Sequence, residues 1–165
     1  MSKALAAAAE AFERTLEDLG FANDDLGDPA EVGRRAALLV SAETIWRHHL
    51  GTLLESEQVE ELLRITPAEV GRLVTDNHLL GLPTKRGKRL FPGFQFGKAR
   101  QAYPDVAPVL RILTSSVSSL YTIASWFASP QPLLRGLTPA AWLRKGGDTN
   151  KLLDAARRSS RRLGQ

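Results

Sequence analysis

The feature that most constrains this chain is residues 54–96, where two short helical patterns follow each other almost without a gap. The first pattern opens at Ser56, whose hydroxyl can cap a helix. Only Arg64 and Ile65 separate its end from Thr66, which opens the second pattern as another cap. The apolar positions of the two patterns are Val59, Leu62, Leu63, Val70, Leu73 and Val74. Two helices joined by so short a turn are typical of a helix-turn-helix.

The second of these helices has a strong start signal. Pro67 stands at the first helical position, where its missing N–H is not needed, and Glu69 can close a capping box with Thr66. The apolar positions leave one polar face outward, which also carries Asp76. In a helix-turn-helix this face would enter the major groove of DNA. The residues predicted to face base edges are Ala68, Glu69, Arg72 and Thr75.

A basic hairpin is predicted directly after this helix. The segment 80–83 leads into a turn over residues 84–88, and the chain returns through residues 89–92. A hairpin beside a helix-turn-helix acts as a wing against the DNA backbone, where cations neutralise phosphates. The residues predicted to contact phosphates are Lys85, Arg86, Lys88 and Arg89.

Charge is distributed unevenly along the chain. Residues 1–50 hold 5 basic and 9 acidic side chains, whereas residues 51–165 hold 17 basic and 9 acidic ones. Within 83–100 every charged side chain is basic. Segregation of this kind favours an anionic partner, although charge alone equally fits a solvated basic face. The position of the cations on a predicted wing favours nucleic acid.

Several classes of function are disfavoured by the composition. The chain has no cysteine, which excludes thiol nucleophiles and zinc-thiolate sites. It shows no paired carboxylates at matched spacing, no phosphate-binding loop and no H-E-x-x-H motif, so we expect neither an enzyme nor a cofactor or metal site. No apolar run approaches the roughly 18 residues of a membrane helix. We therefore expect a cytoplasmic protein without a membrane partner.

An acidic helical arm is predicted over residues 1–50. Residues 2–19 form a helix capped by Ser2, residues 20–27 form a loop or helix end, and a second helix begins at Asp28-Pro29. The apolar stripe of the first helix, which requires a cover, is Leu5, Ala8, Phe12, Leu16 and Leu19. The second helix is expected to bury Leu38, Ile45 and Trp46. The arm fits either a dimerisation element or a cap on the basic part of the chain.

Four further helices are predicted after the wing, over about residues 106–113, 116–128, 138–145 and 149–162. Thr138-Pro139 repeats the start signal of Thr66-Pro67, and the serines at 115–119 are interpreted as a polar helix start. Trp126 and Trp142 are expected in the core of this bundle.

Histidines and aromatic residues near the wing leave alternatives open. His48 and His49 are adjacent, about 100° apart around a helix, and cannot chelate one metal as an i, i+4 pair would. His78 follows the second helix of the motif and would either contact DNA or cap the helix end. The aromatic residues after the turn are expected to pack the hairpin onto the helices, with base stacking as the alternative. They are Phe91, Phe94, Phe96 and Tyr103.

The segment 126–146 reads W-F-A-S-P-Q-P-L-L-R-G-L-T-P-A-A-W-L-R-K-G, and a helix with Leu152, Leu153 and Ala155-Ala156 follows it. This order of a helix, a Pro break, a Gly, a Thr-Pro cap and a Gly resembles the C-terminal domain of Xre/MbcA/ParS-type antitoxins. The segments 89–92 and 95–96 also resemble the family's connection to its DNA-binding part. The resemblance covers about residues 50–160. The chain departs from the family in having Gln131-Pro132 at the usual N-P and in its first 50 residues.

This resemblance implies an antitoxin of a type II toxin-antitoxin system. Its C-terminal domain would occlude a cognate toxin encoded by the neighbouring gene, commonly a RES-type toxin that acts on NAD. Its helix-turn-helix would bind the double-stranded promoter DNA of its own operon. In the family the C-terminal end reaches toward the toxin's active site, which corresponds here to residues 149–165. The residues that would contact the toxin are Lys151, Arg157, Arg158, Arg161 and Arg162. The alternative explanation of these arginines is a favourable interaction with the helix dipole.

The expected fold is mainly α: a helix-turn-helix with a small β-hairpin wing, followed by a C-terminal helical bundle. We expect three parts, a helical arm over 1–50, a winged helix-turn-helix over 51–103 and a helical toxin-binding domain over 104–165. A homodimer or a toxin-antitoxin hetero-oligomer is expected, because a monomer reads only a half-site. The alternative is a stand-alone regulator similar to MerR or excisionase proteins, with a helical dimerisation domain.

Overall fold

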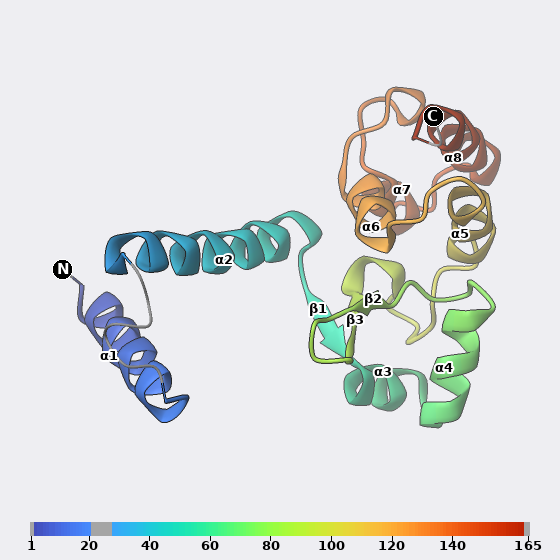
Figure 1. The fold of residues 1–165 in the computed structure, drawn as a ribbon. Helices are drawn as coiled ribbons and strands as arrows, with labels where there is room; N and C mark the ends of the chain where they lie inside the picture. Colours follow the sequence, from blue (N-terminus) through green and yellow to red (C-terminus); the bar gives the residue numbers. More distant parts are fainter. Residues whose placement is uncertain (1, 21–27, 164–165) are drawn as a thin grey trace. The chain divides into compact units, whose positions relative to one another are not determined.

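The computed structural model describes residues 2–20 and 28–163 (Figure 1). The chain divides into two compact units, Met1–Thr44 and Ile45–Gln165. The second unit is mainly helical with a small three-stranded antiparallel sheet, which confirms the predicted fold class. The loop predicted over residues 20–27 lies, apart from Gly20, outside the described residues, as does the side chain of Leu38.

The first unit contains α1 (Lys3–Asp18) and most of α2 (Pro29–Leu50). Both predicted starts are confirmed: the Ser2 hydroxyl accepts a hydrogen bond from the Leu5 N–H (3.2 Å), and the Asp28 carboxylate accepts one from the Ala30 N–H (3.0 Å). Within the described part of this unit no α1 residue is buried, so a cover for the stripe of α1 stays a prediction.

The last turn of α2 belongs to the second unit and anchors to its core. Leu50 is buried there, and Trp46 is half-buried against the ring of Tyr121, at a centroid distance of 5.6 Å. Ile45, which we predicted to be buried, is instead exposed. Ile45 stands next to the unit boundary at the start of this turn, and only the side chains after it contact the core.

The helix-turn-helix and its sheet follow α2. The elements are β1 (Leu53–Glu55), α3 (Ser56–Leu63), α4 (Pro67–Thr75), β2 (Leu82–Pro83) and β3 (Arg89–Pro92). The sheet has the order β1-β3-β2, with both pairs antiparallel. The predicted hairpin of β2 and β3 is confirmed, while β1 was missed because it has only three residues and its partner β3 is distant in sequence.

The predicted cap of α3 is wrong by one residue. Ser56 is the first helical residue, and Glu55 occupies the cap position. The side chain of Gln58 reaches back and accepts a hydrogen bond from the Glu55 N–H (2.8 Å). A Gln three residues after the cap therefore fixes the start, as in a capping box.

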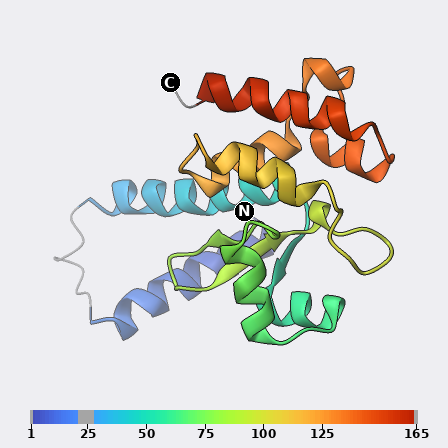
Figure 2. The same cartoon turned by 90° about the vertical axis from the view of Figure 1, so that its right-hand side faces the viewer.

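The C-terminal bundle consists of α5 (Val106–Thr114), α6 (Leu120–Ala128), a 3-10 turn (Pro132–Leu134), α7 (Pro139–Arg144) and α8 (Thr149–Leu163). Helices α5 and α8 lie side by side in Figures 1 and 2. Trp126 and Trp142 are buried, as predicted, and the Trp126 indole donates a hydrogen bond to Ser159 (2.8 Å).

The predicted start of α6 at residue 116 is wrong. Ser119 is the cap, accepting a hydrogen bond from the Thr122 N–H (3.3 Å), and Val117 before it is buried outside any helix. Ser116 instead accepts a hydrogen bond from the Ser160 hydroxyl of α8 (2.9 Å). The serine cluster thus supplies one cap and one contact between helices.

Two clusters of buried apolar residues support the second unit. The smaller one lies under the helix-turn-helix and contains Val59, Val70, Leu79 and Phe91. The larger one joins Leu50, Leu80 and Leu82 to the helices of the bundle. The regions predicted as separate domains, 51–103 and 104–165, therefore share a core and lie in one compact unit.

Candidate nucleic-acid interface

The turn between α3 and α4 is fixed by local hydrogen bonds. Arg64 adopts the left-handed conformation (φ 57°), which ends α3 and allows the Ile65 N–H to donate to the Glu60 carbonyl (3.1 Å). Thr66 then caps α4 by accepting a hydrogen bond from the Glu69 N–H (3.3 Å). Because both signals are local, the sequence located this turn correctly.

Glu69 is engaged in the start of α4. Its carboxylate accepts hydrogen bonds from the N–H (2.8 Å) and the hydroxyl (3.0 Å) of Thr66, and the side chain is half-buried. The hydrogen bond from the Thr66 backbone, followed by that from its hydroxyl, lowers the pKa of Glu69 below its ordinary value of 4.5. Glu69, which we predicted to face base edges, thus has its carboxylate directed at the cap.

The remaining outward face of α4 is open. Ala68, Arg72 and Thr75 are exposed, and Asp76 at the helix end is exposed beside them. The Thr75 hydroxyl donates to the Gly71 carbonyl of its own helix (3.0 Å), so its oxygen remains available as an acceptor. Arg72 is the one cation among the four residues predicted to face base edges.

The tip of the wing is an ordered turn. Thr84 and Lys88 close it with three hydrogen bonds. The Thr84 N–H (2.8 Å) and hydroxyl (3.0 Å) both donate to the Lys88 carbonyl, and the Lys88 N–H donates to the Thr84 hydroxyl (3.2 Å). Gly87 supplies the left-handed conformation that the turn requires (φ 75°). The four predicted phosphate contacts, Lys85, Arg86, Lys88 and Arg89, are all exposed.

Gly81 holds the wing against α4. A Cβ atom at this position would lie 3.2 Å from both Arg89 and Phe91 of β3 and 3.3 Å from Val74 of α4. A side chain here would require these neighbours to shift by a few tenths of an ångström, so the glycine favours the close approach of α4 and β3. No sequence pattern singled out Gly81 beyond its place in a turn.

Two contacts join the interface to the bundle. The Arg111 guanidinium of α5 donates to His78 Nε2 (3.0 Å), and the Tyr121 hydroxyl of α6 donates to the Pro83 carbonyl of β2 (2.9 Å). His78, for which we considered DNA contact or a helix cap, therefore contacts α5. Phe91 is buried, and Phe94 stacks on Phe127 at a centroid distance of 4.9 Å, which supports the packing interpretation of these aromatic residues.

Gln95 is a buried polar residue that the sequence did not reveal. Its amide oxygen accepts from the Leu80 N–H (2.8 Å), and its amide nitrogen donates to the carbonyls of Leu80 (3.0 Å) and Pro92 (3.1 Å). The side chain thereby satisfies backbone groups of the segment after α4 that have no helix or strand partner. It fixes this segment relative to the end of β3.

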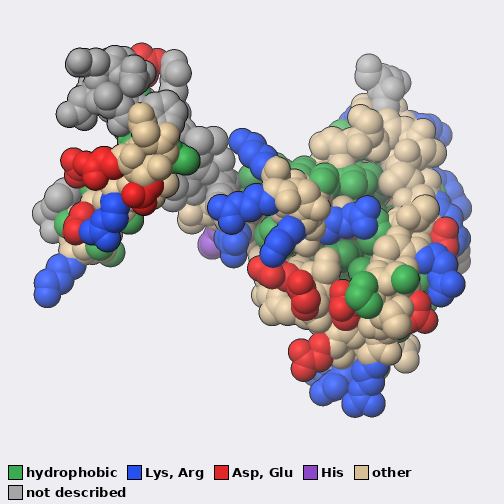
Figure 3. Space-filling model, turned by 60° about the horizontal axis from the view of Figure 1, so that its bottom comes forward, with side chains coloured by type: hydrophobic (Ala, Val, Ile, Leu, Met, Phe, Trp, Pro, Cys, Tyr) green, Lys and Arg blue, Asp and Glu red, His purple; other side chains and the backbone are tan. Residues whose placement is uncertain are grey.

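The predicted toxin-contacting residues lie on one exposed face of α8. The opposite face is buried through Leu152, Ala155, Ala156, Ser159 and Ser160. Lys151 and the four arginines are exposed, and Arg157 forms an exposed ion pair with Asp154 (2.8 Å). On the larger body in Figure 3, Lys and Arg side chains form several separate groups, with Asp and Glu side chains between them.

No helix in the described residues has the length and hydropathy needed to cross a bilayer.

Comparisons with known proteins bear on the fold alone. No protein-family model matches the sequence, and no curated protein matches it. The structure is similar to the NMR structure of Rv2175c, with a TM-score of 0.50 and 20% sequence identity. The match covers 68% of this chain and 79% of that chain, so the chain shares an overall fold with Rv2175c over most of its length.

Proposed function

We propose that this protein binds double-stranded DNA through α4 and the wing. The observation that carries the proposal is the exposed face of Arg72 and Thr75, with a wing tip on which every charged side chain is basic. Gly81 supports it, because its close packing on both Val74 and Arg89 fixes the wing relative to α4.

The two parts of this surface have different tasks. Arg72 can form a bidentate pair with a guanine, which contributes about 1–3 kcal/mol of discrimination between bases. The wing cations neutralise phosphates, which strengthens binding to any sequence and makes it dependent on salt. A single copy reads one half-site, so a dimer on a repeated operator is the expected arrangement.

The test begins with selection of bound sequences from a random double-stranded DNA library by the full-length protein. Arg72→Ala is expected to relax the sequence preference at one or two base pairs. Replacing Lys85, Arg86, Lys88 and Arg89 with Gln is expected to weaken binding to all sequences and to reduce the slope of log affinity against log salt by up to about 4.

A matched control replaces four exposed cations outside this surface with Gln: Lys3, Arg14, Lys145 and Lys151. It changes the net charge by the same amount as the wing variant. The proposed interface would be contradicted if the control variant lost as much DNA affinity as the wing variant. It would also be contradicted if Arg72→Ala left the sequence preference unchanged.

A second candidate function, antitoxin activity, rests on α8. Leu152 and Ala156 anchor this helix in the core, and its opposite face presents Arg157, Arg158, Arg161 and Arg162 to solvent. Such a rigid cationic face fits the active-site cleft of a cognate RES-type toxin, which handles the anionic NAD. Inhibition would be steric occlusion and would require neither a catalytic residue nor a cofactor. The promoter DNA of the operon would then be the target of α4.

Co-expression with the product of the neighbouring gene tests this candidate. Truncation before α8 is unsuitable, because it would remove buried core residues such as Leu152. Replacement of the four arginines with Gln keeps that core. If the neighbour arrests growth, the full-length protein and the wing variant should rescue growth, and the four-arginine variant should not. Without a toxic neighbour or a complex, the antitoxin candidate fails and the stand-alone regulator is preferred.

A further inference from the structure

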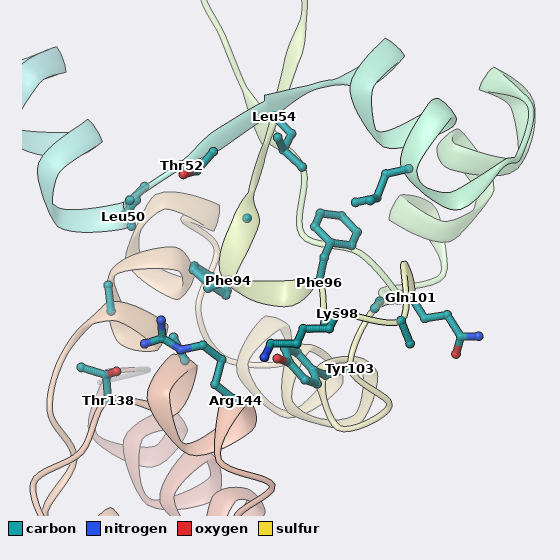
Figure 4. A pocket seen from close by; sticks show the side chains of 18 of the residues that line it. Leu50, Thr52, Leu54, Phe94, Phe96, Lys98, Gln101, Tyr103, Thr138 and Arg144 are labelled. Atoms are coloured by element: carbon teal, nitrogen blue, oxygen red, sulfur yellow. The ribbon is translucent and has the colours of Figure 1, made fainter.

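An open groove of about 1300 Å³ lies within the second unit, and none of its lining residues belongs to α4 or to the wing tip. Most of its walls come from three stretches distant in sequence, residues 48–54, 93–104 and 138–144, and Leu62 and Ala128 complete the lining. Figure 4 shows Phe94, Phe96 and Tyr103 along its floor, with Lys98 and Arg144 extending from different elements into the same space. Because only folding brings these stretches together, no local sequence pattern predicted the groove.

The floor of the groove is apolar and held in place. Phe94 stacks on the buried Phe127 at 4.9 Å, with an interplanar angle of 23°, so its ring is supported from behind. The ring of Tyr103 packs on the backbone of Gly97, where a Cβ atom would lie 3.2 Å away. The Gly93 N–H donates a hydrogen bond to the Thr52 carbonyl (2.7 Å). The half-buried rings of Phe94, Phe96 and Tyr103 give the groove a preformed apolar surface.

The charged groups along the groove share one sign. Its charged lining residues are Lys98 and Arg144, both exposed, and its histidines are His48 and His49. Within residues 2–20 and 28–163, no carboxylate lines it. Among the ion pairs found in the described residues, none involves Lys98 or Arg144. His49 is held by a hydrogen bond between its Nε2 and Ser125 (2.9 Å), which fixes this wall against α6. An apolar floor with cations at its edge is complementary to a molecule that is apolar and carries an anionic head.

We propose that this groove binds an amphipathic organic anion, with its aromatic or aliphatic body on Phe94, Phe96 and Tyr103. Its carboxylate, sulfonate or phosphate head is bound by Lys98 and Arg144. The groove, at about 1300 Å³, has room for a drug-sized molecule. This site is independent of the proposed DNA and toxin surfaces, because it includes none of their residues.

The test uses the fluorescent probe 1-anilinonaphthalene-8-sulfonate, an aromatic anion, with the full-length protein. Competitors share one chain length and differ in charge: decanoate, decanol and decyltrimethylammonium, all below their micelle concentrations. We expect decanoate to displace the probe best and decyltrimethylammonium worst. Equal displacement by the three competitors would overturn the proposal, as would displacement by a DNA duplex at lower concentration than decanoate.

Charge variants locate the site. Lys98→Gln combined with Arg144→Gln should weaken probe binding by about tenfold or more, since both cations that bind the anionic head are lost. The matched control combines Lys3→Gln with Lys145→Gln, which changes the net charge equally at exposed positions outside the groove and outside the wing. It should bind the probe as the unmodified protein does. Equal weakening of both variants would show a general charge effect and overturn the assignment.

A steric variant tests the floor separately from the charges. Ala140→Phe places a ring on a half-buried position that lines the groove and should abolish probe binding. Circular dichroism and thermal unfolding show whether this variant is folded. Unchanged probe binding by the folded variant would overturn the proposal, and if it does not fold, the charge variants decide alone.

Discussion

Helices α4 and α7 begin with the same chemistry and serve different purposes. Each follows a Thr cap with Pro at the first helical position, and in each the Thr hydroxyl accepts from the N–H three residues on, at 3.3 Å in α4 and 3.1 Å in α7. Helix α4 then exposes Arg72, whereas α7 buries Trp142 and Leu143 in the larger core. The cap therefore determines where a helix begins, and the side chains after it determine whether the helix presents a surface or supports a core.

The two helices also differ in the residue three positions after the cap. In α4 this residue is Glu69, whose carboxylate completes a capping box, while in α7 it is Ala141. The exposed helix thus has a stronger local start than the buried one. This fits the rule that packing supplies most of the stability of a buried helix, whereas an exposed helix depends more on its local signals.

The largest expected difference between the two helices concerns burial. Trp142→Ala should lower the free energy of unfolding by about 3–5 kcal/mol, because it leaves a cavity and removes the indole that donates to the Asp148 carbonyl (3.0 Å). Arg72→Ala should change that free energy by no more than about 0.5 kcal/mol, because Arg72 is exposed. Urea unfolding of both variants measures the difference, and similar losses would refute the contrast between a supporting and a presenting helix.

The next difference concerns DNA. Arg72→Ala should weaken binding to the selected sequence by about 1–3 kcal/mol. The matched change in α7, Arg144→Ala, also removes an exposed arginine from a helix with a Thr-Pro start, and it should leave DNA binding within about 0.5 kcal/mol. Fluorescence anisotropy at one fixed salt concentration compares them. Equal losses of DNA affinity for Arg144→Ala and Arg72→Ala would contradict the assignment of α4 as the helix that reads DNA.

Removal of either Thr cap should lower the free energy of unfolding by a similar amount. Thr66→Ala and Thr138→Ala each remove a side-chain acceptor at a helix start, and each should lower the free energy of unfolding by about 1 kcal/mol. Replacement by Ser, which keeps the hydroxyl, serves as the control at both positions. A negligible effect at Thr138 beside a full effect at Thr66 would show that burial alone positions α7.

The smallest expected difference is a dependence on pH that only α4 has. Since the folded-state pKa of Glu69 is lowered, its ionised form stabilises the fold above its ordinary value of 4.5, and this contribution is lost as the pH falls through the lower folded-state value. Glu69→Gln keeps a capping box without the charge. The stability advantage of the unmodified protein over this variant should therefore shrink below pH 4.5, as followed by thermal unfolding. A stability advantage of the unmodified protein that grows as the pH falls would contradict this prediction.

Local signals account for what the sequence predicted well. The cap at Thr66, the turn at Gly87 and the start of α8 each depend on a few neighbouring residues, and each lies where the pattern placed it. Predictions that depended on distant partners were less accurate. Strand β1 exists through its pairing with β3, and the start of α6 was misplaced because Val117 is buried by tertiary packing.

The candidate sites show the same difference between features set by local sequence and features set by contacts between distant residues. The exposed cations of the wing and of α8 could be listed from the sequence, because charge and helical period suffice to place them on a surface. The engagement of Glu69 by Thr66 depends on a rotamer that only the structure specifies. The contact of Arg111 with His78 and the groove at Phe94 join elements that no local pattern connects.

The three hydrogen bonds of Gln95 have a consequence for finding relatives of this protein. The position requires one side chain that both accepts from and donates to the same backbone residue, Leu80, and that also reaches Pro92. Glu lacks the donor, and Asn is shorter by one methylene group. A Gln at this place, just after a Pro-Gly-aromatic sequence, is therefore a compact signature for this loop. It can be sought in chains too divergent for whole-sequence comparison.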